Sequence, residues 1–189
     1  IQVHDDPCRI SSVHWNSLLA AQLSPTPFMR HEYLSALHES GSASPETGWI
    51  PQFLTLQQDG ELTAACPLYL KEHSYGEYVF DWAWADAYRR SGLNYYPKFV
   101  SAVPYTPATS TRLLHAPEAD QTAVKRLLLD TALALTRRSG ASSLHLLFPA
   151  PAELPLFSAA GMSLRKDCQF HWTNRDYSCF EDFLRTFTA

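Results

Sequence analysis

The sequence predicts one mixed α/β (α+β) domain over residues 1–189, in which a sheet is flanked by helices. Two segments with strand character, 52–58 and 61–70, are joined by Asp59-Gly60, which is a strong hairpin signal. Residues 118–139 carry the clearest helical periodicity, and segments of strand and helix character alternate after them. A length of 189 residues suits a single domain with a sizeable core.

The first part of the chain predicts two helices, at 11–22 and 27–39. Each has apolar residues at roughly helical spacing, and Ser11 or Ser12 can cap the first helix. The apolar positions are Val13, Trp15, Leu18 and Leu19 in the first segment, and Phe28, Met29, Tyr33, Leu34 and Leu37 in the second.

Further strands are expected at 97–105 and 142–149, with helix 118–139 between them. Arg137, Arg138 and Gly140 supply the signals of a helix C-terminus. We expect these strands to join 52–58 and 61–70 in one sheet, with the long helix against it.

The last part predicts a short helix at 152–161, which Pro155 confines to its second part, and a half-exposed strand at 167–173. An apolar stripe then begins a final helix at Phe180, and the sequence stops at Ala189 before that pattern is complete. The interruption indicates a longer natural protein, and exposed rings over 180–189 would favour self-association.

Composition excludes several classes of protein. The net charge is −4 with no run of basic residues, which argues against a DNA-binding module. The four cysteines form no C-x-x-C pair, and the histidines lack H-E-x-x-H spacing, so no metal site is expected. Four cysteines do not make a disulfide-dense scaffold, so a reducing, cytoplasmic setting is expected. No apolar run approaches the length of a membrane span.

Residues 71–100 combine nine aromatic rings with several carboxylates, including Glu77, Asp81 and Asp86. Two arrangements remain open: the rings pack inward and the acids face water, or apolar surroundings raise the pKa of an acid and prepare it for proton transfer. An extended chain as far as Trp84 separates acids from rings better than a helix does, since alternate residues point to opposite sides.

The segment PYTPATSTRLL at 104–114 follows an expected strand and precedes the long helix. Its hydroxyls, including that of Thr106, and the guanidinium of Arg112 could bind an anion. The alternative is a proline-rich turn whose hydroxyls bond to their own backbone.

The pieces PLYLKEHSYGEYVFDWAWADAY, YYPK and PYTP…RLL together resemble the FemAB-like proteins, bacterial members of the GNAT acyltransferase superfamily associated with peptidoglycan biosynthesis or recognition. GWIPQFLTL, QFHWTNRDY and FEDFL extend the resemblance over most of the chain. The resemblance implies a GNAT-type fold and a second GNAT-like half beyond Ala189.

The resemblance also implies transfer of an acyl or aminoacyl group to an amine acceptor, such as a cell-wall precursor. The donor would be an aminoacyl-tRNA or an acyl-CoA thioester. GNAT enzymes that use acyl-CoA carry a glycine-rich R/Q-x-x-G-x-G/A loop, whereas residues 109–112 read TSTR. Without glycine the backbone approaches a pyrophosphate less closely, which argues against CoA.

Roles follow for the residues in the matched segments. Asp81 or Asp86 would accept the proton of the amine, and Tyr95, Tyr96 or Tyr105 would protonate the leaving group. Substrate binding is assigned to His73, Glu77, Trp82, Trp84, Lys98, Thr106, Arg112 and His171.

We expect Glu77, Asp81, Asp86, Tyr95, Tyr96, Lys98 and Arg112 to converge on one concave surface. Two alternatives stand beside this prediction. The aromatic stretch could be only a rigid buttress under the sheet, and the chain could be a catalytically silent binding module for a cell-wall precursor or another partner.

Overall fold

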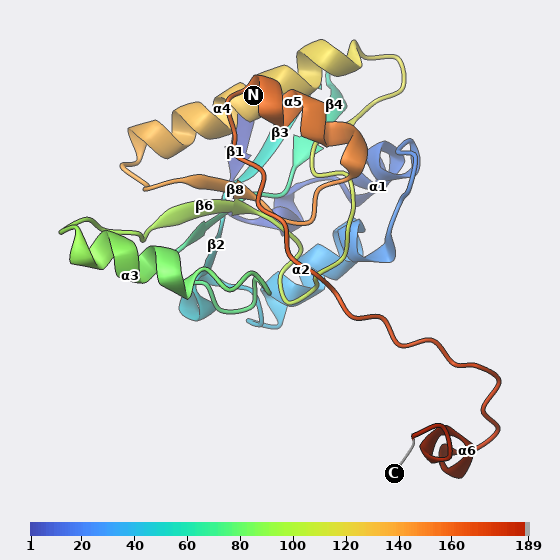
Figure 1. Cartoon of the computed structure of the whole chain (residues 1–189). Helices are drawn as coiled ribbons and strands as arrows, with labels where there is room; N and C mark the ends of the chain where they lie inside the picture. Colours follow the sequence, from blue (N-terminus) through green and yellow to red (C-terminus); the bar gives the residue numbers. More distant parts are fainter. Residues whose placement is uncertain (188–189) are drawn as a thin grey trace.

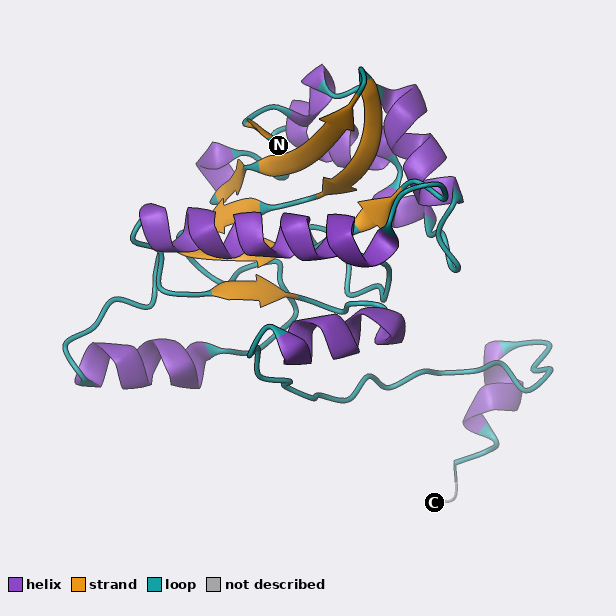
Figure 2. Ribbon diagram, turned by 90° about the horizontal axis from the view of Figure 1, so that it is seen from above, coloured by secondary structure: helices purple, strands orange, loops and turns teal. Residues whose placement is uncertain are grey.

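The computed structural model describes residues 1–187, which form two four-stranded sheets with helices on both faces (Figures 1 and 2). The strands are β1 (Gln2–His4), β2 (Trp49–Pro51), β3 (Phe53–Gln58), β4 (Glu61–Cys66), β5 (Tyr69–Lys71), β6 (Lys98–Ser101), β7 (Leu114–His115) and β8 (Leu144–Leu146). The helices are α1 (Ser12–Ala20), α2 (His31–Glu39), α3 (Trp82–Arg90), α4 (Gln121–Arg138), α5 (Leu154–Ala159) and α6 (Phe180–Leu184). The predicted mixed α/β class is confirmed.

One long hairpin belongs to both sheets. Its tip is the predicted Asp59-Gly60 turn, and both residues have positive φ angles, of 52° and 86°. Strands β3 and β4 pair in the sheet ordered β1-β3-β4-β7, and their continuations β2 and β5 belong to the sheet ordered β2-β5-β6-β8. The expected strand 61–70 is therefore split at Pro67, which has no N–H to donate to a ladder.

The strand next to this hairpin is also interrupted. Strand β6 pairs antiparallel with β5, and β7 pairs antiparallel with β4. Between them, residues 102–113 leave the sheets and return. Strand β8 then pairs with β6 in parallel, and helix α4 makes the crossover between β6 and β8. The expected strand 97–105 thus ends at Ser101.

Two hydrophobic clusters hold the helices on the sheets. One contains Trp15 and Leu18 of α1 and Leu34 of α2, packed with Phe53. The other contains Leu128, Leu129 and Ala132 of α4 with Phe157 of α5, packed with Leu54 and Phe99. Because neighbouring residues of a strand face opposite sides, Phe53 and Leu54 serve different clusters. Helices α4 and α5 therefore cover one face, and α1 and α2 the other (Figure 1).

Two expectations for local structure are wrong. Residues 167–173 form no strand, because they run through solvent with no neighbouring strand to supply ladder hydrogen bonds. The chain before Trp84 is not extended, because residues 72–81 form an irregular loop in which Tyr78 has a φ of 55°, and Trp82 already begins α3. Expected helix 118–139 is confirmed as α4, and the final helix is confirmed as α6. No helix in the described part of the chain is long and apolar enough to span a membrane.

Candidate functional site

The acids of the aromatic stretch point into the protein and the rings between them point out. Glu77 and Asp81 are 2% and 1% exposed, whereas Tyr78 and Phe80 are 53% and 67% exposed. This segment is not a strand, and Tyr78 has a left-handed φ of 55°, so the irregular loop conformation turns Glu77 and Asp81 inward. The structure thus reverses the ordinary arrangement, in which rings are buried and acids face water.

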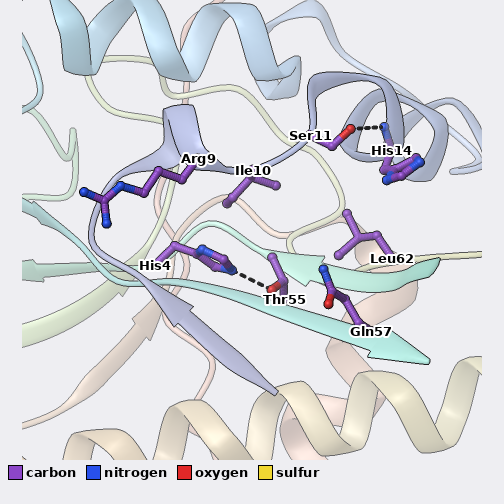
Figure 3. Close-up of a pocket in the computed structure, with 8 residues that line it drawn as sticks. All are labelled: His4, Arg9, Ile10, Ser11, His14, Thr55, Gln57 and Leu62. Carbon is purple, nitrogen blue, oxygen red and sulfur yellow. Dashed lines mark hydrogen bonds between the residues drawn. The ribbon is translucent and has the colours of Figure 1, made fainter. Parts of the chain in front are cut away.

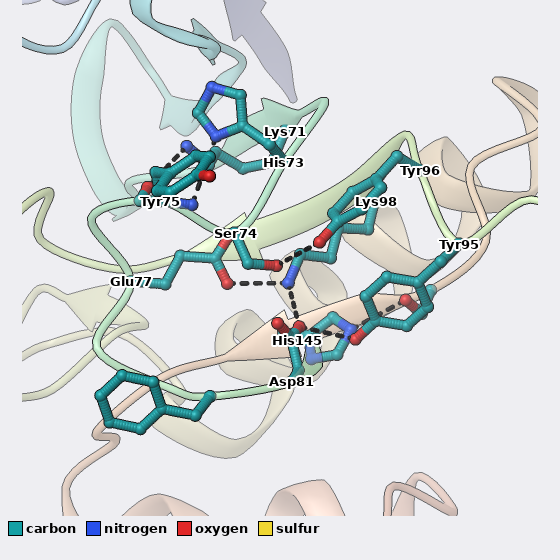
Figure 4. Close-up of polar contacts among 12 residues, drawn as sticks. Lys71, His73, Ser74, Tyr75, Glu77, Asp81, Tyr95, Tyr96, Lys98 and His145 are labelled. Atoms are coloured by element: carbon teal, nitrogen blue, oxygen red, sulfur yellow. Dashed lines mark hydrogen bonds and ion pairs between the residues drawn. The ribbon is translucent and has the colours of Figure 1, made fainter. Parts of the chain in front are cut away.

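The buried acids share one cation. Lys98 Nζ lies 2.7 Å from Glu77 Oε2 and 2.5 Å from Asp81 Oδ2 (Figure 4). Tyr95 donates its hydroxyl proton to the same Asp81 oxygen across 2.7 Å. All four side chains are buried. Strand β6 supplies Lys98, and the residues before it supply Tyr95, so the sheet fixes both groups beneath the 72–81 segment. We call Glu77, Asp81, Tyr95 and Lys98 the buried network.

A second lysine lies beside this network. Lys71 of β5 is the register partner of Lys98, and it is fully buried. Its ammonium lies 3.7 Å from the centroid of the Trp49 ring and donates to the carbonyl of Tyr75 across 3.2 Å. The sequence analysis did not select Lys71. Its position at the end of an expected strand, next to the aromatic stretch, could have drawn attention to it. Its place opposite Lys98, however, follows only from the register of β5 and β6.

Burial changes the proton affinities in this region. Burial raises the pKa of Glu77 despite Lys98. Burial would also raise the pKa of Asp81, but the hydrogen bonds of Lys98, Ser74 and Tyr95 outweigh it and lower that pKa. Burial lowers the pKa of Lys71 to about 7. Each carboxylate also has one buried oxygen, Glu77 Oε1 and Asp81 Oδ1, with no partner among the described residues.

Nearby groups extend the network. Ser74 and Tyr96 share a hydrogen bond of 2.8 Å between their hydroxyl oxygens. The His145 ring of β8 lies with its centroid 6.2 Å from that of Tyr95 (Figure 4), and burial lowers its pKa to about 4. His145 is therefore a neutral imidazole near pH 7. Neither Ser74 nor His145 was predicted, because each reaches the site through tertiary contacts.

A surface groove lies beside the network, with a volume of about 490 Å³. Its lining residues are Ala85, Asp86, Arg89, Leu93, Asn94, Tyr95 and Tyr96. Asp86 binds Arg89 across 2.5 Å and Arg90 across 3.3 Å, and these neighbours lower its pKa. The Tyr95 side chain reaches from this groove to Asp81. The groove is large enough for a small ligand.

Other predicted residues surround this region without joining the network. Trp82 and Trp84 are exposed on α3. The His73 ring lies against Gly48, and the Tyr105 ring lies between Gly76 and Trp49. Thr106 bonds to Tyr33, and His171 is exposed in the C-terminal segment, where it bonds to Gln169.

Arg112 does not join the expected surface. Its side chain is 0% exposed. Its three guanidinium nitrogens donate to the carbonyls of Leu147, Ala108 and Phe148 and to the Ser110 hydroxyl. The predicted anion-binding role is therefore wrong in this structure, because the donors already have partners inside the chain. Of the seven residues expected to converge, Glu77, Asp81, Tyr95, Tyr96 and Lys98 lie together, and Asp86 lines the adjoining groove.

A second, smaller pocket of about 50 Å³ lies between β1, β3 and the start of α1 (Figure 3). His4, Arg9 and His14 line it, and His4 bonds to Thr55 across 2.8 Å. Arg9 is exposed and pairs with Asp5 and Asp6. This pocket contains none of the predicted site residues.

Comparison with solved structures shows the fold of GNAT acetyltransferases. The chain aligns with an aminoglycoside N-acetyltransferase, AAC(6')-Iy, determined in complex with CoA, at 12% identity and a TM-score of 0.51, covering 87% of this chain and 91% of that one. It also aligns with AAC(6')-Ig from Acinetobacter haemolyticus at 11% identity and a TM-score of 0.48, covering 88% and 97% of the two chains.

No curated protein sequence matches this chain. The FemAB-like family model does match, over residues 7–189, and its description is peptidoglycan biosynthesis or recognition. The match spans nearly the whole chain and includes every residue of the buried network. The protein therefore belongs to the FemAB-like family, with a GNAT-type fold.

Proposed function

We propose that this protein is an acyl- or aminoacyl-transferring module that acts on an amine acceptor, with a peptidoglycan precursor as its substrate class. The family supports the link to peptidoglycan, and the fold is shared with N-acetyltransferases. The acceptor would bind in the groove beside Tyr95 and Tyr96. Four free cysteines support a cytoplasmic location.

The observation that carries this proposal is the position of Tyr95. Its side chain lines the groove, and its hydroxyl lies 2.7 Å from Asp81 Oδ2 inside the protein. Lys98 holds the same oxygen, and Glu77 lies on the other side of Lys98. The Tyr95 side chain therefore connects the wall of the groove to a hydrogen-bonded network that contains two buried carboxylates.

This path suits the proton balance of amine acylation. The amine nitrogen uses its lone pair to form the new N–C bond, the bond from the carbonyl carbon to the carrier breaks, and the nitrogen gives up one proton. Tyr95 can accept that proton while passing its own to Asp81. The carrier leaves with the electron pair and takes a proton, so no net charge remains in the network. The same relay in reverse, from Asp81 through the Tyr95 hydroxyl, would return the proton to the carrier.

The exposed rings would hold the rest of the acceptor. Tyr78, Phe80, Trp82 and Trp84 are exposed just before and within the first turn of α3, the helix that lines the groove with Ala85, Asp86 and Arg89. Aromatic faces contact sugars and apolar side chains over a large area with few rotatable bonds. A sugar-peptide precursor offers both kinds of surface.

A second function, recognition without catalysis, is favoured by one observation. Glu77, Asp81 and Lys98 are each at most 2% exposed, so none of them can touch a ligand in the groove directly. In that case the network would only stiffen the segment that carries the rings.

One experiment separates the two functions. Thermal-shift measurements with muropeptides of defined peptide length would detect binding, since a ligand specific for the folded state raises its stability. Mass spectrometry of those muropeptides after incubation with activated aminoacyl esters would detect transfer. Binding with transfer supports the transferase, binding without transfer supports recognition, and absence of both overturns the proposed substrate class.

A further inference from the structure

The parallel strands β6 and β8 end side by side (Figure 1), and helix α4 connects them. In α/β sheets, the crevice beyond the carboxyl ends of such strands is where nucleotide phosphates usually bind. Backbone N–H groups and helix N-termini there supply the anion-binding donors. In this chain, the N–H groups of Ser110, Arg112, Leu113, Thr122 and Ala123 all have internal partners.

The side chain of Arg112 fills the crevice from within. Its Nε donates across 2.7 Å to the carbonyl of Leu147, the residue directly after β8. Its Nη2 donates to Ala108 across 2.9 Å, and its Nη1 to Ser110 Oγ across 2.9 Å. These bonds tie the 102–113 excursion to the end of β8. A guanidinium with these partners cannot turn outward without breaking several buried hydrogen bonds.

A carboxylate takes the neighbouring backbone donors. Glu153 is 2% exposed, and its two oxygens accept the N–H groups of Arg112, at 2.9 and 3.1 Å, and of Leu113, at 2.8 Å. The Ser110 N–H donates to the carbonyl of Phe148 across 3.1 Å. The carboxylate therefore occupies the place that a phosphate oxygen would take on these amides.

The N-terminus of α4 is satisfied in the same way. Asp120 accepts the N–H groups of Thr122 and Ala123, both across 3.1 Å. Glu118 adds a second negative charge to the loop before the helix. The helix macrodipole attracts anions to this end, but the carboxylate of Asp120 already supplies a negative charge there.

We infer that acyl-CoA does not fit this domain, because Arg112 and Glu153 close the phosphate crevice beyond β6 and β8 with the chain's own charges. The acyl donor therefore makes no pyrophosphate contact at this crevice. The inference concerns binding at one place and does not depend on the proposed transfer reaction, so either can fail alone.

Hydrogen exchange of the unmodified protein tests the closure directly. We expect the amides of Ser110, Arg112 and Leu113 to be protected in the free protein, and their exchange to be unchanged by CoA, acetyl-CoA or inorganic pyrophosphate. Added protection of these amides, rising to saturation with CoA, would overturn the inference. Amide exchange does not depend on transfer activity, so this result can be interpreted even if the protein transfers no acyl group.

A variant supplies the complementary test. In Glu153→Ala, the amides of Arg112 and Leu113 lose their acceptor, and inorganic phosphate can replace it. We expect phosphate to raise the Tm of the variant by roughly 2–4 °C more than chloride at equal ionic strength. The parent and Glu61→Gln, a change at an exposed acid at the start of β4, should show no such difference. If Glu153→Ala does not fold, the exchange experiment decides alone; a folded variant with no phosphate effect contradicts the assignment of these donors.

Discussion

The ammonium of Lys98 lies 2.5 Å from Asp81 Oδ2, in a place where neither side chain meets solvent. Taking these charges out of water is costly, and only their mutual attraction and hydrogen bonds offset the cost. Glu77 completes the arrangement on the other side of the lysine. Removing the cation would leave two buried carboxylates without compensation.

Lys98→Met should therefore lower the free energy of unfolding by about 3–5 kcal/mol, the usual effect of breaking a buried ion pair. Urea denaturation measures this change. Arg126→Met provides the control, since solvent screens the exposed pair of Arg126 with Asp130 and the pair contributes little to stability. Equal losses in the two variants would show that the buried network does not stabilise the fold.

Tyr95→Phe tests the proposed proton path. The variant keeps the ring but loses the hydroxyl that donates to Asp81. If Tyr95 relays a proton, the rate of amine acylation should fall about 100-fold, the scale of general acid–base catalysis. Tyr88→Phe is the matched control, because its ring lies with its centroid 5.2 Å from that of Tyr95. Full activity of Tyr95→Phe would remove Tyr95 from the mechanism.

Lys71 makes stability depend on pH above neutrality. Its pKa is about 7 in the folded protein, against 10.5 for an unperturbed lysine, so between these values the unfolded chain holds a proton that the folded chain lacks. The free energy of unfolding should then rise with pH across this window, by at most about 1.4 kcal/mol per pH unit. Denaturation at a series of pH values measures the slope.

Lys71→Met should flatten that slope, because the titrating group is gone. Lys166→Met, which removes an exposed lysine of the C-terminal segment, should leave it unchanged. The same slope in Lys71→Met and the parent would assign it to another group.

Gly76 allows Tyr105 to lie against the 72–81 segment. A Cβ at Gly76 would lie 2.6 Å from the Tyr105 ring, and its φ is +79°. Gly92 has a similar φ of +71° but open space around it. Both alanine variants carry the cost of a left-handed residue, about 1–2 kcal/mol. We expect Gly76→Ala to lose more stability than Gly92→Ala in thermal unfolding, and equal losses would show that the ring moves freely.

Local patterns in the sequence predicted much of the fold. The Asp59-Gly60 turn, the periodicity of α4 and the separation of acids from rings near Glu77 are all short-range signals. The split of the hairpin between two sheets depends on Pro67 and on which strand lies alongside. Residues 167–173 alternate like a strand, but alternation alone cannot supply a pairing partner.

The site was less predictable, because its members meet through the sheet. Glu77, Asp81 and Lys98 were selected from residue types in one segment, but their burial follows from a lysine that attracts both acids inward. Lys71 opposes Lys98 only through the register of β5 and β6. Arg112 looked like an anion site because its neighbours are hydroxyls; its partners are carbonyls that become close only in the fold.

The final prediction concerns the C-terminal aromatic cluster, which comprises Trp172, Tyr177, Phe180, Phe183 and Phe187. These rings contact one another, with 4.9 Å between the centroids of Phe183 and Phe187. Phe180 and Phe187 are 65% and 62% exposed, as the apolar stripe of this segment suggested. Exposed rings gathered in one place favour association.

We therefore expect the protein to self-associate in sedimentation velocity experiments as its concentration rises, and Phe180→Ser with Phe187→Ser to shift it toward monomer. Val13→Ser is the control, because Val13 is an exposed apolar residue of α1 outside the cluster. The double variant should leave the stability of the folded domain unchanged, because Phe180 and Phe187 belong to neither of the two hydrophobic clusters that hold the helices on the sheets. A parent protein that stays monomeric at all concentrations would rule out self-association through 180–187.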